Sequence, residues 1–247
     1  MTVAARYDGF LLDMNGTFMF GQDRFGPQQT YSGTYEELGG SMLSAVEVQR
    51  IVSRAIDFLL DRYVHPDFED DFPSVREAFQ DNPATDTLPA SETQLLMRVL
   101  AEHECGAVPP AYADWLCDTS RTHWLGLITN ICSPKDRWLD QFARDGIDGV
   151  FSASVWSSDG RSIKPSAVLF EEILAAWPGS RDRLAMVGDS PRCDIAGAQR
   201  VGLATILVGN TDHAGIQPTH RYQSILEIPT RHERGPSPSL DVRAPAD

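Results

Sequence analysis

The chain has 247 residues, 42% of them hydrophobic and 23% charged, which suits a globular protein with one large domain or a core domain plus an insert. Its net charge of −14 argues against a nucleic-acid partner, because phosphate backbones bind basic surfaces. No export signal or membrane-length apolar stretch is recognisable, and the four cysteines lack C-x-x-C spacing. We therefore expect a cytoplasmic protein with reduced thiols and no membrane partner.

Short apolar runs along the chain predict buried strands. In chain order they are residues 9–13, 124–129, 149–152, 184–188 and 204–208. Apolar runs without alternation are typical of a parallel sheet that is covered on both faces. The sequence therefore predicts a central parallel sheet.

Helical patterns separate the last four predicted strands. Ser133 is placed to cap a helix that Gly146 would end, and the string "DIAGAQRVG" predicts a short helix that ends at Gly202. Between them, apolar residues recur at helical spacing at Phe170, Ile173, Leu174 and Trp177. This alternation predicts an α/β core with a doubly wound, Rossmann-like parallel sheet.

The interval between residues 13 and 124 is too long for one crossover. It carries an amphipathic stripe (Val48, Ile51, Val52, Ala55 and Leu59) and a Ser91/Gln94 pattern typical of a capping box. We therefore predict an all-helical cap over residues 27–119, inserted into a core formed by residues 1–26 and 120–231. The polar, proline-rich residues 232–247 are predicted to be a flexible tail.

Polar residues follow three of the predicted strands, and a lone lysine precedes a predicted helix. They are Asp13, Thr129, Lys164, and Asp189 with Asp194. Ligands of open parallel sheets bind beyond the carboxyl ends of the strands, so these side chains are expected to converge. Each residue alone also fits a plain role, such as a turn former, a helix cap or a surface charge.

Four segments carry a resemblance to a known family. "DMNGT", "LITN", "IKPS" and "VGDSPRCD", in this order and spacing, resemble the four motifs of the haloacid dehalogenase (HAD) superfamily. Most members are Mg²⁺-dependent phosphatases with an aspartate nucleophile. The inserted helical segment is similar to the family's first class of caps (C1).

The resemblance implies a role for each motif residue. Asp13 would be the nucleophile that forms an aspartyl-phosphate, and Lys164 would add positive charge beside it. Mg²⁺ would be held by the metal ligands Asp13, Asn15 (through its backbone carbonyl), Asp189 and Asp194. Phosphate oxygens would be bound by Gly16, Thr129, Asn130 and Lys164. The expected substrate is a small phosphorylated metabolite.

Asn15 departs from the family pattern, which has a second aspartate at this position. An amide cannot transfer a proton near neutral pH, and such help is worth about 10²–10⁴ in rate. Asp23 and the acidic "DFEDDF" run at 67–72 are candidate replacements, although a solvated acidic loop also explains that run. Arg24 could contact a substrate anion or be a plain surface charge.

Other outcomes of Asn15 stay open. The leaving group could need no proton, or the protein could be a catalytically weakened ligand-binding or regulatory relative. A haloacid dehalogenase-type reaction at a carbon–halogen bond is a further alternative, but the Asp189/Asp194 pair favours a metal. Cleavage of phosphonates would need a cap lysine, and no lysine precedes Lys135.

Overall fold

The computed structural model describes residues 3–229, so the tail predicted at 232–247 lies outside the described residues. Within this range one six-stranded parallel sheet forms the core, in the order β3-β2-β1-β4-β5-β6. The strands are β1 (Gly9–Leu12), β2 (Trp124–Thr129), β3 (Ala153–Trp156), β4 (Leu184–Gly188), β5 (Ala204–Val208) and β6 (His220–Tyr222). The predicted parallel α/β core is confirmed.

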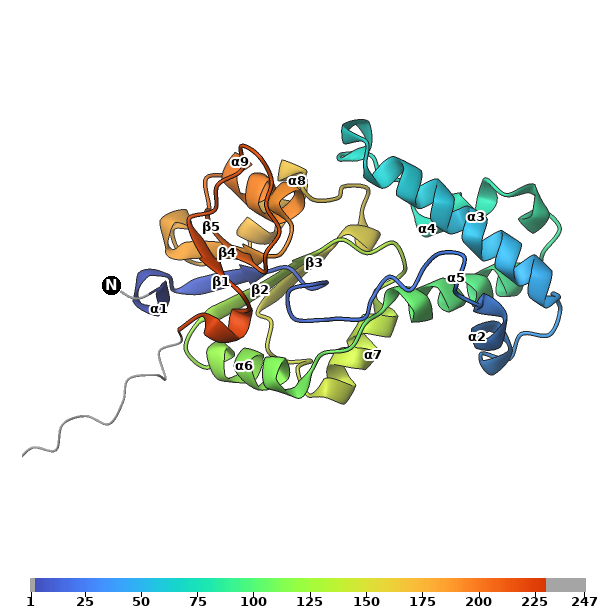
Figure 1. The fold of residues 1–247 in the computed structure, drawn as a ribbon, viewed down its shortest axis with the longest axis horizontal. Helices are drawn as coiled ribbons and strands as arrows, with labels where there is room; N and C mark the ends of the chain where they lie inside the picture. The colour runs from blue at the N-terminus through green and yellow to red at the C-terminus, as the bar shows by residue number, and fades with distance from the viewer. Residues whose placement is uncertain (1–2, 230–247) are drawn as a thin grey trace, which may run out of the picture.

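Helices cover both faces of this sheet (Figure 1). One face packs against α8 (Ala167–Leu174) and α9 (Gly197–Arg200), and the other against α6 (Pro110–Ser120) and α7 (Asp136–Asp145). Successive residues of β1 alternate between the two layers, because strand side chains point to opposite faces: Leu11 joins the first layer, and Phe10 and Leu12 the second. A short helix, α1 (Val3–Arg6), precedes β1.

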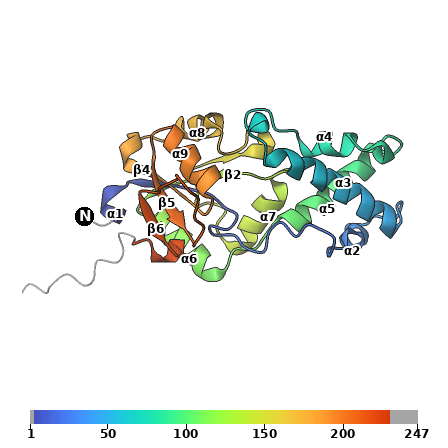
Figure 2. The ribbon, with the colours of Figure 1, turned by 45° about the horizontal axis from the view of Figure 1, so that its top comes forward.

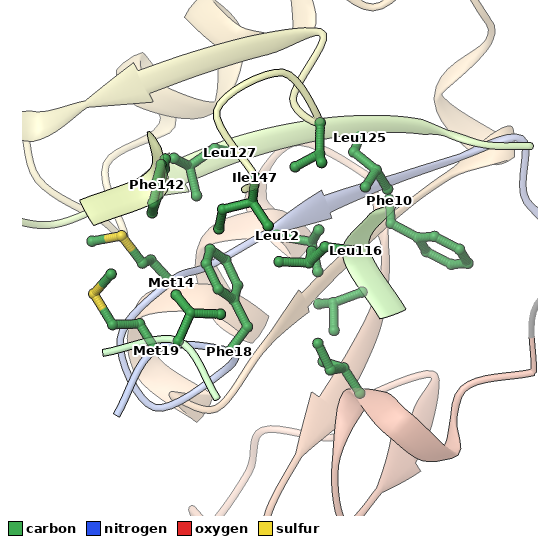
Figure 3. Packing of buried hydrophobic residues seen from close by; sticks show 14 of the residues in the cluster. Phe10, Leu12, Met14, Phe18, Met19, Leu116, Leu125, Leu127, Phe142 and Ile147 are labelled. Carbon is green, nitrogen blue, oxygen red and sulfur yellow. The ribbon is translucent and has the colours of Figure 1, made fainter. Parts of the chain in front are cut away.

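The second layer, on the side of α6 and α7, forms the larger hydrophobic core, which includes β1 and the loop that follows it. Figure 3 shows Phe10 and Leu12 of β1 with Leu125 and Leu127 of β2, close to Met14 and Phe18 of the following loop. All six side chains are fully buried. This packing fixes the segment after β1 against the sheet, and that segment carries the motif around Asp13.

The insertion after β1 is helical and projects to one side of the sheet (Figures 1 and 2). Its helices are α2 (Tyr31–Glu37), α3 (Ala45–Tyr63), α4 (Val75–Gln80) and α5 (Ala90–Glu104). The predicted stripe on α3 is buried in a hydrophobic cluster that these helices share. We call helices α2–α5 and their connections the cap.

Helix α6 packs against the sheet. Its Ala113 and Leu116 belong to the same cluster as Phe10 and Leu125. We therefore propose that the cap ends between α5 and α6, earlier than the predicted boundary at residue 119.

Several local predictions were wrong. The third strand lies at Ala153–Trp156 and not at 149–152, and β6 was not predicted. Lys135, not Ser133, precedes α7, and α5 follows Pro89 without the Ser91/Gln94 box. Capping boxes form instead at Ser44/Glu47 and Ser74/Glu77. Trp177 lies beyond α8 and packs edge-on against Trp124, with ring centroids 5.1 Å apart.

Candidate active site

Three aspartates meet at the carboxyl ends of β1 and β4, the two central strands. Asp13 follows β1, and Asp189 follows β4; Asp194 lies one turn further on. Each of the three offers a carboxylate oxygen, and these oxygens all lie within 4.8 Å of one another. The predicted convergence of these aspartates is present in the structure.

Two glycines make this close approach possible. Gly16 has a φ of +79°, a conformation that favours glycine, and a Cβ there would overlap the carboxylate of Asp189. A Cβ at Gly188 would overlap the carboxylate of Asp194. Both positions therefore need a residue without a side chain.

Lys164 provides the counter-charge for two of the aspartates. Its side chain is buried, and its Nζ donates to Asp13 Oδ1 and, at 2.8 Å, to Asp194 Oδ1. Burial alone would lower the pKa of Lys164, but the attraction of Asp13 and Asp194 outweighs this effect and raises the pKa. The lysine is therefore a fixed cation.

Neighbouring groups hold the carboxylates in place. Thr17 Oγ1 donates to Asp13 Oδ2 at 3.1 Å, and the backbone N–H of Ser190 donates to Asp194 Oδ2 at 2.9 Å. Asp194 lies in η5 (Pro191–Ala196), a turn of π-helix. Ser190 caps the start of this turn, because its Oγ accepts a hydrogen bond from the Cys193 N–H at 3.1 Å. Such turns are often found at functional sites.

A cavity of about 310 Å³ lies between this acidic cluster and the cap. The cap and the linker that leads to it contribute apolar side chains, among them Phe25, Leu59, Leu60, Tyr63 and Phe72. The core contributes Asp13, Asn15, Asn130, Lys164, Asp189 and Asp194, and two further carboxyl groups, Asp23 and Glu104, line the wall. Among the described lining residues, Lys164 is the only basic one.

The other predicted site residues lie at or near this cavity. Asn15 lines it, and within residues 3–229 its buried Oδ1 has no hydrogen-bond partner. The Thr129 hydroxyl is buried and likewise unpaired in the described part of the chain, but Thr129 does not line the cavity. The Asn130 side chain clamps the backbone of Lys164, accepting from its N–H at 2.8 Å and donating to its carbonyl at 3.2 Å.

Burial changes the acidity of two lining carboxyl groups. Desolvation raises the pKa of Asp189 to about 7, and the nearby charges of Asp13 and Asp194 add to the rise. Desolvation also raises the pKa of Glu104 to about 7, although its carboxylate accepts from the Cys132 N–H at 2.5 Å and from the Ser133 N–H at 2.9 Å. Both carboxyl groups therefore carry a proton more readily than exposed ones.

Ion pairs connect the cap to the core beside the cavity. Glu69 of the cap pairs with Arg200 at 2.8 Å and with Arg192, inside η5, at 3.3 Å. Asp71 pairs with Arg161, and Asp70 accepts from Ser166 Oγ. The acidic run at 67–72 thus serves the cap–core interface, and only its Phe72 lines the cavity.

Arg24 does not face a substrate position. Its guanidinium donates to the carbonyls of Gly21 at 2.7 Å and Cys105 at 2.9 Å, and also to that of Glu102. Arg24 therefore joins the two linkers between cap and core. These are the segment from β1 to α2, which contains Gly21, and the segment from α5 to α6, which contains Cys105. The interpretation of Arg24 as a contact for a substrate anion is wrong.

Sequence reasoning missed three residues of the site. Thr17 could have been found, because it stands in the quoted "DMNGT" segment, four residues after Asp13. Tyr63 and Glu104 could not, because they lie at the ends of cap helices α3 and α5 and approach the site only through the docking of the cap.

The acidic cluster fits a divalent cation. Three carboxylates and one ammonium leave two uncompensated negative charges when all are ionised. Oxygen ligands from aspartates are those that Mg²⁺ prefers, and Asn15 adds an unpaired buried oxygen nearby. The residues present therefore suit Mg²⁺ in charge and in donor type.

Comparisons with known proteins give the same fold. Residues 163–228 match a family described as HAD-hydrolase-like, and no curated protein sequence matches the chain. The magnesium-bound HAD-hydrolase YfnB from Bacillus subtilis is 19% identical, with 90% of this chain and 100% of that chain covered and a TM-score of 0.58. Its description also reports interdomain movement.

Two further solved structures differ from each other in the activity they are named for. A HAD phosphatase from Thermococcus onnurineus is 23% identical, covering 89% of this chain and 95% of that chain (TM-score 0.57). A 2-haloacid dehalogenase from Pseudomonas syringae is 21% identical over the same shares (TM-score 0.59). The chain therefore has the HAD fold, which is compatible with both reactions, and the choice between them rests on the residues of the site.

Proposed function

We propose that this protein is a HAD-type hydrolase that removes the phosphoryl group from a small phosphate monoester. Asp13 is the nucleophile, and Asp13, Asp189 and Asp194 hold Mg²⁺, with the backbone carbonyl of Asn15 as a further ligand. The observation that carries the proposal is the cluster of three carboxylates, two of which pair with a buried lysine. We also propose a cytoplasmic location. As a separate finding, none of the helices described between residues 3 and 229 is long and apolar enough to cross a membrane.

The residues of the site divide the work of phosphoryl transfer. When bound, Mg²⁺ neutralises negative charge on the phosphate, which otherwise repels a carboxylate nucleophile. Thr17 and Lys164 fix the carboxylate of Asp13 from two sides. An Asp13 oxygen attacks phosphorus and the bond to the leaving oxygen breaks; water then hydrolyses the aspartyl-phosphate and restores Asp13. Lys164 and the Asn130 N–H are proposed to bind phosphate oxygens; Gly16 and Thr129 do not line the cavity, and no phosphate contact is assigned to them.

The charge of the cavity favours a phosphatase over a haloacid dehalogenase. A 2-haloacid carries a carboxylate, which needs a cation or several donors close to the carbon that reacts. Lys164 is the only basic residue among the described lining residues, so the cavity has no second cation for a substrate carboxylate beside the one at the nucleophile. The acidic cluster, in contrast, suits a metal that can receive the phosphate.

The walls of the cavity also indicate the organic part of the substrate. Phe25, Leu60 and Phe72 lie on the cap side, so the group that leaves with the ester oxygen meets apolar surface. We therefore propose that this group is uncharged and partly apolar. Bisphosphates and phosphorylated carboxylic acids are expected to be poor substrates.

A direct test measures phosphate released from a panel of monophosphates, with Mg²⁺ and with chelator. Turnover that needs Mg²⁺ and disappears in Asp13→Asn supports the proposal. Asp159→Asn, at an exposed ion pair on the core surface, is the matched control and is expected to keep activity. Chloride release from 2-chloropropionate without metal would instead support a dehalogenase. No turnover by the wild type, and none gained in Asn15→Asp, would favour a binding or regulatory protein.

A further inference from the structure

Asn15 leaves the proposed reaction without a proton carrier at the position next to the nucleophile. An amide can donate or accept a hydrogen bond, but it cannot protonate a leaving oxygen or deprotonate water near neutral pH. A replacement must have an ionisable side chain, must face the same cavity, and must be free to exchange its proton. These criteria can be applied to each titratable residue that lines the cavity.

Most titratable lining residues already have fixed partners. Lys164 is bound to Asp13 and Asp194, and those two with Asp189 form the proposed metal site. The Glu104 carboxylate accepts two backbone N–H groups. The Tyr63 hydroxyl accepts from Asn130 at 3.2 Å and contacts Cys193 Sγ at 3.6 Å. Burial raises the pKa of Tyr63, Cys193 and Cys132, so these groups do not exchange protons near neutrality.

Asp23 is the exception. Within residues 3–229 no hydrogen bond or ion pair to its carboxylate is present, although the residue lines the cavity that contains Asp13. Its main chain is well fixed, because its N–H donates to the Glu104 carbonyl at 3.2 Å and its carbonyl accepts from the Phe25 N–H at 2.7 Å. Its φ is +53°, a conformation that is uncommon for residues other than glycine and is often found at functional sites.

The linker therefore presents a free carboxyl group from a rigid backbone. The adjacent Arg24 strengthens this arrangement, because it binds carbonyls of both linkers at 2.7 Å and 2.9 Å and keeps them side by side. The Asp23 side chain is thus held at the wall of the cavity, on the segment that joins the nucleophile's strand to the cap.

We propose that Asp23 is the general acid and general base of the reaction, in place of Asn15, whose amide cannot transfer a proton. This inference depends on the proposed phosphoryl transfer, and it assigns the proton steps of that reaction to a carboxyl group on the linker. The residue is ten positions from Asp13 and outside the motif in which the family pattern places its acid.

The proton balance of the two steps is complete. As Asp13 attacks phosphorus and the ester P–O bond breaks, protonated Asp23 transfers its proton to the leaving oxygen and becomes a carboxylate. In the second step this carboxylate takes a proton from the water that attacks phosphorus, the bond between phosphorus and the Asp13 oxygen breaks, and inorganic phosphate leaves. Asp23 is again protonated, and no further reactant is needed.

The surroundings of Asp23 support a proton transfer near neutral pH. The residue keeps contact with water, but the protein around it desolvates the carboxylate and raises its pKa to about 6; Arg24 lowers the pKa and Asp13 raises it. Glu104 and Cys132 are the other titratable groups whose charge it influences directly. A carboxyl group with such a pKa is populated in both protonation states close to neutrality.

The test compares two phosphates that differ in their need for a proton. Benzyl phosphate releases a basic alkoxide, and 4-nitrophenyl phosphate releases a stable phenolate. In Asp23→Asn we expect kcat/KM for benzyl phosphate to fall by about 10²–10⁴-fold and that for 4-nitrophenyl phosphate by less than about tenfold. For the wild type, kcat/KM with benzyl phosphate should decrease as the pH rises through about 6, and this limb should be absent in Asp23→Asn.

Two further variants separate a proton role from a structural one. Asn15→Asp placed on the Asp23→Asn background should restore hydrolysis of benzyl phosphate. Asp61→Asn, which removes an exposed carboxylate on α3 away from the cavity, should leave both substrates unaffected. Equal losses on both substrates, or no loss on either, would overturn the role of Asp23 while the proposed function stands. No turnover of either substrate by the wild type would overturn both.

Discussion

Lys164→Met removes the buried cation of the acidic cluster and preserves most of the length of the side chain. In metal-free protein this change leaves Asp13 and Asp194 without their shared counter-charge. Water cannot easily replace that charge, because the lysine side chain is only 2% exposed. Breaking a buried ion pair costs about 3–5 kcal/mol, since a charge remains desolvated and unpaired. For a chain of this size that loss corresponds to a decrease in Tm of roughly 6–20 °C.

The assay is thermal unfolding in chelator and in excess Mg²⁺. A divalent cation replaces the missing positive charge, so Mg²⁺ should raise the Tm of Lys164→Met more than that of the wild type. Without metal, loss of Lys164 should raise the pKa of the buried Asp194 carboxyl further, because the lysine lowers that pKa in the wild type. The stability that protonation of Asp194 provides is present at low pH and lost as the pH rises, so the variant should be closest to the wild type in mildly acidic buffer.

The chain offers a matched control for this experiment in its one other lysine. Lys135 pairs with Asp159 at the surface, where the two side chains are 37% and 51% exposed. Lys135→Met is expected to change stability by less than about 1 kcal/mol. If both lysine variants lose the same Tm, or if Mg²⁺ stabilises wild type and Lys164→Met equally, the assigned role of Lys164 as the cluster's counter-charge is wrong.

Three other variants probe the surroundings of the cluster. Gly16→Ala places a methyl group against Asp189, and calorimetric titration should show a Mg²⁺ affinity about 10–100-fold lower; unchanged affinity would contradict the proposed metal site. Glu69→Gln removes the one negative charge that faces both Arg192 and Arg200, and it should speed hydrogen exchange in the 66–72 segment at nearly unchanged Tm. Equal exchange rates would show that these pairs do not hold the cap. Glu104→Gln points an amide N–H at a backbone donor, and denaturant unfolding should show a loss of about 1–3 kcal/mol. A smaller loss would mean that the loop after β2 finds other acceptors.

The central strands were predictable from sequence, and the edge strands were not. β1, β2, β4 and β5 lie within the sheet, where both faces are covered and continuous apolar runs are required. β3 and β6 are its edges, and their sequences, ASVW and HRY, contain polar residues that an edge strand tolerates. A strand was predicted at 149–152 because this run is apolar. In the structure it is a loop, and its Val150 is apolar because the side chain is buried in the core cluster on one face of the sheet.

The acidic cluster was predictable for a related reason. Asp13 and Asp189 each follow an apolar run, and parallel strands bring such positions to one edge. The wall formed by the cap was not predictable, because Tyr63 and Glu104 reach the cavity only through tertiary docking. The role of the acidic run at 67–72 depends on arginines far along the chain, and no local pattern identifies those partners.

The position of Arg192 connects two events that are usually considered separately. This arginine anchors the cap through Glu69, and Asp194, two residues later in the same π-helical turn, is a proposed metal ligand. A cation held by Asp194 would be bound to the same turn of backbone that carries the Arg192–Glu69 ion pair. Thermodynamic linkage makes the coupling reciprocal. If cation binding changes the stability of the contact between cap and core, formation of that contact changes the affinity for the cation by the same factor.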